Sequence, residues 1–273
     1  MKKFVITVLS GLLVFSLIAC NSSAKQPSST DGEISIPDNS KTEESIEGTD
    51  SKDIDTDTQY ALGDIILADG STVKAEDLTA IDRNNVPIAV IAGFQENGTA
   101  FGIGVHRSAS PLQWASDASA GYATNFKNIV CTQKSALDFS GDKDGSDNWE
   151  MICTQDNKDT SDSAVNYPAF HFVNTYAETY GLNGEYASGW YMPSIAELCK
   201  IYQNREVINN SLQHINSLDN DAAMNGLATN WYWSSSQSGS ENDYAWFVHY
   251  LNGYAGECPK NFTNVHALAV RVF

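Results

Sequence analysis

The sequence predicts an α+β domain, in which strands come first, helices follow and strands return. Residues 64–105 contain short β-branched runs separated by turn residues. Residues 168–215 carry apolar side chains at three- and four-residue spacing, which is typical of helices with one buried face. Residues 231–273 return to strand-like alternation. We therefore expect the two ends of the domain to pair in one mixed or antiparallel sheet.

The first part of the domain is expected to form two hairpins. Residues 64–67 and 72–74 flank an Asp-Gly pair, and residues 88–92 and 100–105 flank an Asn-Gly pair. These dipeptides favour the tight turns that join antiparallel strands, because their backbones adopt positive φ at low cost.

Two main helices are expected in the middle of the domain. The first spans residues 168–180, with Gly181 as its stop signal. The second begins after Pro193, where Ser194 and Glu197 have the spacing of a capping box. The apolar pattern then continues to residue 215 and favours a further short helix.

The N-terminal residues 1–19 have the features of a lipoprotein signal peptide. Lys2 and Lys3 precede an apolar run that is short for a membrane span. The run ends in Leu-Ile-Ala-Cys, which resembles the lipobox of bacterial lipoproteins, where cleavage leaves the cysteine first and acyl chains such as palmitate are attached to it. We therefore expect Cys20 to carry a lipid anchor. The alternative is a short buried helix with a chance cysteine.

Residues 20–59 are expected to be a disordered tether that follows the lipidated cysteine. Residues 21–59 contain ten acidic residues, three lysines, thirteen Ser or Thr and no aromatic residue. Such a segment buries too little apolar surface to offset its conformational entropy. The tether would hold the following domain away from the membrane.

The remaining residues 60–273 are expected to fold as one domain with a strand-rich first part, 60–130, and a second part, 131–273. All six tryptophans and all five histidines lie in this segment. It contains 11 basic and 24 acidic residues, which gives it a net charge of −13. The whole chain has 273 residues and a net charge of −18. This balance excludes a typical nucleic-acid partner and disfavours polyanions.

The second part of the domain carries the motifs of a known family. The motifs are Trp190-Tyr-Met-Pro-Ser-Ile-Ala-Glu-Leu198, Tyr232-Trp-Ser-Ser235, Ala245-Trp246, Gly253 and Val270-Arg271. They resemble the bacterial DUF1566 family, also called the Legionella collagen-like protein C-terminal domain. That family is related to the C-type-lectin-like and formylglycine-generating-enzyme-like folds. The resemblance implies a lectin-like fold and an exported binding or adhesion module, and it does not identify the ligand. We expect the ligand to be a glycan or an extracellular protein.

Three tryptophans are candidates for contact with a sugar, because an exposed indole can stack on the apolar face of a pyranose and nearby polar groups can bond hydroxyls. The candidate ligand-binding residues are Trp231, Trp233, Ser234, Ser235, Asp243, Trp246 and Asn252. The alternative, which the high average burial of tryptophan favours, places all three indoles in the core.

An acidic loop is a candidate calcium site. Oxygen ligands are dense between residues 138 and 150, and Gly145 stands where an EF-hand loop bends. The candidate ligands are Asp142, Asp144, Asp147 and Glu150. The register lacks the bidentate glutamate of an EF-hand, so a solvated acidic turn is the favoured alternative. No other cofactor is expected.

Four cysteines remain after lipidation, and an even number in an exported chain favours two disulfides. Of the three possible connectivities we expect Cys131 with Cys153 and Cys199 with Cys258.

The sequence favours a lipid-anchored, non-catalytic protein of the bacterial envelope, in the outer membrane or at the cell surface. The histidines lack metal-ligand spacing, and no serine stands in a nucleophile elbow. Two alternatives stay open: a modifying enzyme of the formylglycine-generating type, which would need two cysteines side by side, and an envelope component that binds only proteins.

Overall fold

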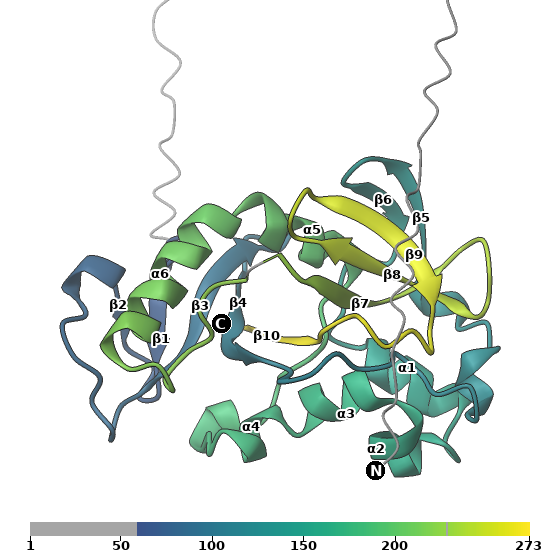
Figure 1. Ribbon diagram of the computed structural model, residues 1–273, viewed down its shortest axis with the longest axis horizontal. Helices are drawn as coiled ribbons and strands as arrows, with labels where there is room; N and C mark the ends of the chain where they lie inside the picture. Colours follow the sequence, from purple (N-terminus) through teal and green to yellow (C-terminus); the bar gives the residue numbers. More distant parts are fainter. Residues whose placement is uncertain (1–58, 228) are drawn as a thin grey trace, which may run out of the picture. The chain divides into compact units, whose positions relative to one another are not determined.

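The computed structural model describes residues 59–227 and 229–273, which belong to one folded unit with two sheets and several helices (Figure 1). The α+β class predicted from the sequence is confirmed. The predicted signal peptide, the lipid attachment at Cys20 and the acidic tether up to residue 58 lie outside the described residues. None of the described helices is long and apolar enough to span a membrane.

The first sheet has the strand order β10-β4-β3-β1-β2, and every neighbouring pair is antiparallel. Its strands are β1 Ile65–Leu67, β2 Thr72–Val73, β3 Pro87–Phe94, β4 Ala100–Arg107 and β10 Leu268–Val272. Both predicted hairpins are present, as β1–β2 and β3–β4. The chain's last strand joins its early strands, because Val270 of β10 lies opposite Ile103 of β4. The expected parts 60–130 and 131–273 therefore share this sheet.

The second sheet has the order β6-β5-β7-β8-β9, with β5 and β7 parallel and the other pairs antiparallel. Its strands are β5 Val130–Ser135, β6 Asp138–Gly141, β7 Trp231–Ser238, β8 Tyr244–His249 and β9 Tyr254–Pro259. The expectation of one sheet shared by both ends of the domain is thus wrong for β7, β8 and β9. These strands pair with one another and with a hairpin from the middle of the chain.

The helices form two groups in sequence and in space (Figure 1). The α-helices are α1 Asn148–Gln155, α2 Ser163–Asn166, α3 Pro168–Asn174, α4 Tyr176–Thr179, α5 Ile195–Gln203 and α6 Arg205–Leu218. The 3-10 helices are η1 Ala75–Asp77, η2 Ala120–Tyr122, η3 Lys127–Ile129, η4 Thr160–Asp162 and η5 Gly184–Ala187. The single helix predicted over residues 168–180 is broken at Thr175, whose hydroxyl donates to the carbonyl oxygen of His171 at 2.8 Å and competes with the helical backbone pattern.

Helix α5 begins at the predicted capping box. The Ser194 hydroxyl accepts from the Glu197 amide at 3.2 Å, and the Glu197 carboxylate accepts from the Ser194 amide at 2.8 Å. Ile195, Leu198 and Ile201 are buried on one side of this helix. Helix α5 packs against β3 of the first sheet and against β6, β7 and β8 of the second, so it lies where the two sheets approach each other.

Candidate functional site

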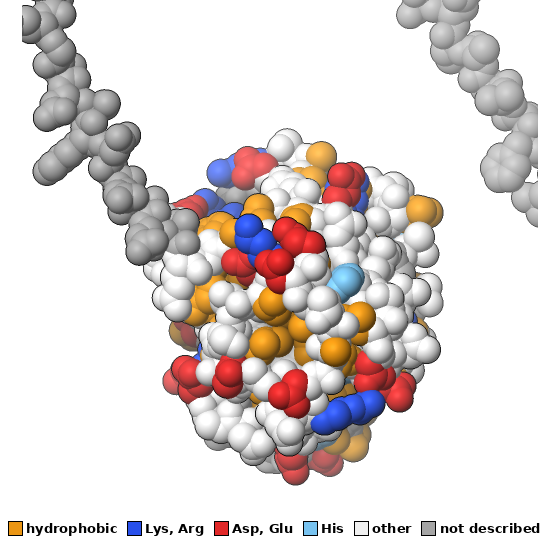
Figure 2. Space-filling view, turned by 90° about the vertical axis from the view of Figure 1, so that its left-hand side faces the viewer, with side chains coloured by type: hydrophobic (Ala, Val, Ile, Leu, Met, Phe, Trp, Pro, Cys, Tyr) orange, Lys and Arg blue, Asp and Glu red, His pale blue; other side chains and the backbone are white. Residues whose placement is uncertain are grey.

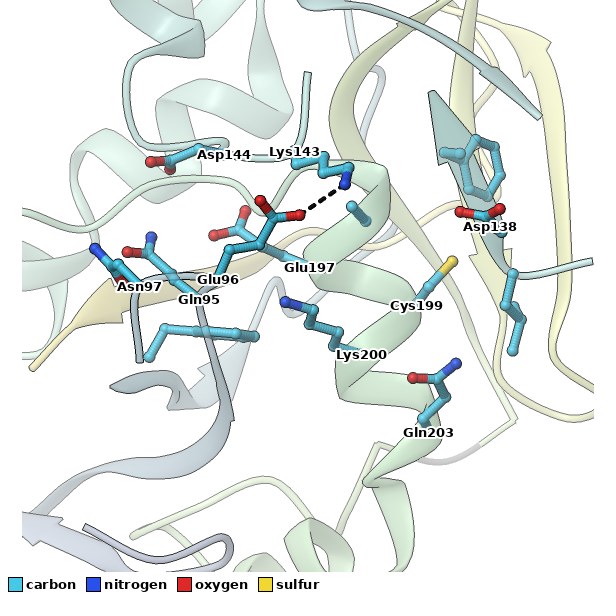
Figure 3. A pocket seen from close by; sticks show the side chains of 14 residues that line it. Gln95, Glu96, Asn97, Asp138, Lys143, Asp144, Glu197, Cys199, Lys200 and Gln203 are labelled. Atoms are coloured by element: carbon cyan, nitrogen blue, oxygen red, sulfur yellow. Dashed lines mark hydrogen bonds and ion pairs between the residues drawn. The ribbon is translucent and has the colours of Figure 1, made fainter. Parts of the chain in front are cut away.

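A cleft of about 380 Å³ lies where α5 faces the turn between β3 and β4 on one side and β6 with its following loop on the other (Figure 3). Its lining combines apolar and charged side chains. The lining residues are Gln95, Glu96, Asn97, Phe101, Leu137, Asp138, Phe139, Lys143, Asp144, Ala196, Glu197, Cys199, Lys200 and Gln203.

The helix contributes one stripe of side chains to this cleft. Ala196, Cys199, Lys200 and Gln203 are spaced by three and four residues, so they lie on one face of α5. The opposite stripe is buried in the core and fixes the rotation of the helix. Ser194 caps the helix, and its hydroxyl also donates to the carbonyl oxygen of Lys143 at 2.8 Å, so the first turn is held against the loop after β6.

Glu197 is a buried carboxylate beside the cleft, with 2% of its surface exposed. One oxygen accepts from the Tyr191 hydroxyl at 2.7 Å, and the other accepts from the amides of Ser194 at 2.8 Å and Gly145 at 3.0 Å. Burial raises its pKa to about 7, against the opposing effect of these three donors. The bond to Gly145 ties the loop after β6 to the start of α5, so Glu197 holds two walls of the cleft together.

Both lysines of the cleft are already bound by other groups of the protein. The Lys143 ammonium donates to Glu96 at 2.7 Å, and Figure 3 shows this ion pair joining the β3–β4 turn to the loop after β6. The pair lowers the pKa of Glu96 and raises that of Lys143, chiefly through the hydrogen bond between them. The Lys200 ammonium donates to the carbonyl oxygen of Phe94 at 3.0 Å. Neither ammonium is left without a partner.

The floor and one wall of the cleft are apolar. Phe101 is fully buried, and Phe139 is 3% exposed and packs edge-on against Trp246 with ring centroids 4.9 Å apart. Leu137 and the exposed Asp138 precede Phe139 on the same hairpin. A carboxylate therefore stands at the rim, directly beside an apolar surface.

The predicted sugar platform does not exist, because two of its tryptophans belong to the core. Trp233 is fully buried, and its indole N–H donates to the carbonyl oxygen of Leu112 at 2.8 Å. Trp246 is 6% exposed and donates to the carbonyl oxygen of Cys131 at 2.9 Å. The neighbouring hydroxyls, of Ser234 and Ser235, are fully buried too. Burial with satisfied indole donors makes these residues parts of the fold, so their assignment to a ligand is wrong.

The other predicted ligand residues do not line the cleft. Trp231 is half-buried, and its ring stacks on Phe247 with centroids 4.6 Å apart and planes within 1°. Asp243 is half-buried, and Asn252 is exposed in the turn between β8 and β9. The stacking contact therefore occupies one face of the Trp231 indole, and it gives the residue a packing role.

The acidic loop does not form the predicted calcium site. Asp142 accepts from the Asp144 amide at 3.2 Å and from the Asn148 side-chain amide at 2.9 Å, and Asp144 accepts from the Ser146 amide at 2.9 Å. The carboxylates thus close the turns of the loop itself. Within the described residues, no group of three or more His, Cys, Asp or Glu is arranged to hold a metal ion. The assignment of a cation to Asp142, Asp144, Asp147 and Glu150 is therefore wrong.

Neither predicted disulfide is present, because Cys131, Cys153, Cys199 and Cys258 are free thiols. Cys131 donates to the carbonyl oxygen of Asp142 at 3.0 Å instead of meeting Cys153. Cys199 and Cys258 pack in different hydrophobic clusters of the core. Burial raises the pKa of Cys131 to about 11 and of Cys199 and Cys258 to about 12, so these thiols stay protonated and weakly nucleophilic at neutral pH.

Lys260 is a second buried charge, and it does not line the cleft. It has no exposed surface, and its ammonium donates to the carbonyl oxygens of Gly121 at 2.9 Å and Thr124 at 3.2 Å and to the Gln237 side chain at 3.2 Å. Burial lowers its pKa to about 7. Its contacts join the strand end at β9 to the segment around η2, which is a role in the fold.

Sequence reasoning did not find the cleft, although it assigned other roles to four of the lining residues. It assigned Glu197 to helix capping, Asp138 and Asp144 to an acidic loop, and Cys199 to a disulfide. The signal that was available is the capping carboxylate itself. A Glu at this position of a buried helix start needs several donors, and those donors come from the elements that build the cleft.

No protein-family model and no curated protein matches the chain. Among solved structures, the chain is similar to the crystal structure of a fimbrial protein from Bacteroides ovatus, with a TM-score of 0.53 and 16% sequence identity. The match covers 78% of this chain and 49% of that one, so the chain spans about half the length of that structure. At this identity the likeness shows a shared fold.

Proposed function

We propose that the chain is an exported, non-catalytic binding or adhesion module of the bacterial envelope, and that its ligand enters the cleft beside α5. The observation that carries the proposal is the cleft itself, with an apolar wall next to charged side chains on three converging segments. Its one thiol, Cys199, has a pKa raised to about 12, which suits packing better than nucleophilic attack.

Two further observations support the location and the class. The lipobox ending at Cys20 supports a lipid anchor, and the structural neighbour is described as a fimbrial protein. We also propose that the domain is a divergent DUF1566-type, C-type-lectin-like module. The support is that the resembling residues Trp190 to Leu198 form the entry and first turn of α5.

The test is the binding of the wild-type protein to an array of glycans and extracellular matrix proteins, at low and at high salt. The same array is probed with a variant whose new side chain fills the cleft. Ala196 is half-buried on the cleft face of α5, so Ala196→Phe should abolish the binding of any true ligand. Asn210→Phe, at an exposed position of α6, is the matched control and should bind like the wild type. Turnover of a substrate by the purified chain, or array binding that Ala196→Phe leaves intact, would overturn the proposal.

A further inference from the structure

The cleft has an excess of negative charge. Four carboxylates line it, from Glu96, Asp138, Asp144 and Glu197, against two ammonium groups. One ammonium is neutralised by Glu96, and the other is bound by a backbone carbonyl. Within the described residues, no group donates a hydrogen bond to the side chain of Asp138. The rim therefore offers acceptors that the protein does not use.

The shape of the cleft suits a long side chain with a charged end. Leu137 and Phe139 give the cleft apolar surface, and the exposed Asp138 carboxylate stands beside them, at the opposite end of the cleft from Asp144 (Figure 3). A lysine or arginine side chain has the same sequence of properties, with methylene groups that pack against apolar surface and a cationic head that bonds carboxylates. An uncharged group would leave the Asp138 carboxylate without a partner, and an anionic group would be repelled by it.

The rest of the domain reinforces this selection at longer range. Residues 60–273 have a net charge of −13, and Figure 2 shows acidic side chains scattered around a central patch of hydrophobic ones on one face. Such a field attracts basic partners and repels polyanions over about one Debye length, roughly 10 Å at 0.1 M salt.

Resting on the proposed function, we propose that the cleft receives a lysine or arginine side chain from a basic segment of a partner protein. The methylene groups of that side chain pack against Leu137 and Phe139, and its cationic head bonds the carboxylate of Asp138. The partner is recognised by one inserted side chain within a generally basic segment, so affinity depends on salt and on the Asp138 carboxylate.

The test uses fluorescein-labelled glycine-rich peptides that contain lysine, arginine, norleucine or glutamate at the same positions, with fluorescence anisotropy as the readout. Norleucine keeps the hydrocarbon stem and removes the charge. We expect the lysine and arginine peptides to bind, and the norleucine and glutamate peptides to bind at least about tenfold more weakly. Asp138→Asn should weaken binding of the lysine peptide about tenfold.

The matched control removes one acid elsewhere. Asp117 is exposed and does not line the cleft, so Asp117→Asn should change binding less than about twofold. Equal losses in the two variants would show diffuse attraction and overturn the inference, as would equal binding of the lysine and norleucine peptides.

The array separates this inference from the function on which it rests. A ligand that is lost with Ala196→Phe while the lysine and arginine peptides fail to bind leaves the binding function standing and overturns the basic side chain as its ligand. If no ligand and no peptide depends on Ala196, both proposals fail.

Discussion

Two buried charges, Glu197 at the start of α5 and Lys260 after β9, are held in closely similar ways. Each has almost no exposed surface, and each makes three hydrogen bonds to uncharged groups. Burial favours the neutral form of each group, so it raises the pKa of Glu197 and lowers the pKa of Lys260, to about 7 in each case. By their local chemistry alone, the two residues are equal candidates for a functional role.

The surroundings of the two charges separate them. Glu197 borders a cleft of about 380 Å³, whereas the Lys260 ammonium lies over the rings of Trp114 and Phe126, with centroids at 4.7 and 5.0 Å. A ligand can approach the elements that Glu197 joins and cannot approach Lys260. A shifted pKa therefore marks a candidate site only where accessible volume adjoins the group.

Lys260 should contribute mainly to stability. Lys260→Met is expected to lower the free energy of unfolding by about 3 kcal/mol at about pH 8.5, because the carbonyl oxygens of Gly121 and Thr124 lose their donor inside the core. Near pH 7 the loss should be smaller by about 1.5 kcal/mol. The folded pKa lies below the unfolded value of 10.5, so the unfolded chain binds the extra proton in this window and wild-type stability rises with pH.

Urea unfolding at the two pH values measures this difference, with Lys158→Met as the control at an exposed position. The control should keep the wild-type stability and its rise with pH. If Lys260→Met were as stable as Lys158→Met at both pH values, the buried Lys260 side chain would contribute nothing to the fold and the contrast with Glu197 would lose its basis.

Glu197 should make the stability of the domain fall as the pH rises, which is opposite to the effect of Lys260 and occurs over a lower pH range. Its folded pKa is raised from 4.5 to about 7, so the stability it contributes is complete below about pH 4.5 and is lost as the pH rises through 7. The wild type should lose about 2–3 kcal/mol over this range through Glu197. Glu197→Gln should remove that slope, because its oxygen still accepts from the Ser194 and Gly145 amides while the side chain no longer titrates.

The comparison between wild type and Glu197→Gln isolates this group from the other carboxylates that titrate in the same range. Thermal unfolding followed by circular dichroism from pH 4.5 to 7 is sufficient. Parallel curves for the two proteins would mean that Glu197 is ionised at its ordinary pKa and that its burial has no energetic cost.

Local features of the sequence predicted the local parts of this arrangement. The Asp-Gly and Asn-Gly pairs determined both hairpins of the first sheet, and Ser194 with Glu197 determined the start of α5. Each of these signals depends on residues within a few positions of one another. Turns and helix caps of this kind can therefore be predicted before the tertiary structure is known.

The second sheet and the cleft could not be predicted in this way, because they depend on pairing between distant segments. Strand β5 has the exposed polar residues Thr132, Gln133 and Lys134, and its parallel partner β7 is about a hundred residues further along the chain. The cleft joins Glu96, Lys143 and Lys200 from three such segments. No periodicity of a single segment contains that information.

The sequence alone could not predict the burial of Trp233 and Trp246 for a related reason. An indole next to hydroxyl residues is compatible with a sugar platform and with a core position, and the choice depends on which face of β7 and β8 meets another layer. In the folded domain both indoles donate to backbone carbonyls of distant segments, at Leu112 and Cys131. These partners are known only once the sheets are assembled.

Breaking the ion pair of Lys143 and Glu96 should have the smallest effect on stability of the changes considered. The direction in which it changes peptide affinity tests the charge of the ligand. Both side chains are largely exposed, so Lys143→Met should leave the melting temperature unchanged within measurement error. The variant frees the Glu96 carboxylate and removes a positive charge from the cleft, so the pKa of Glu96 should rise toward its ordinary value and the lysine peptide should bind severalfold more tightly. Weaker or unchanged binding of the lysine peptide to Lys143→Met would mean that its charge is not recognised in the cleft, which contradicts the proposed basic ligand.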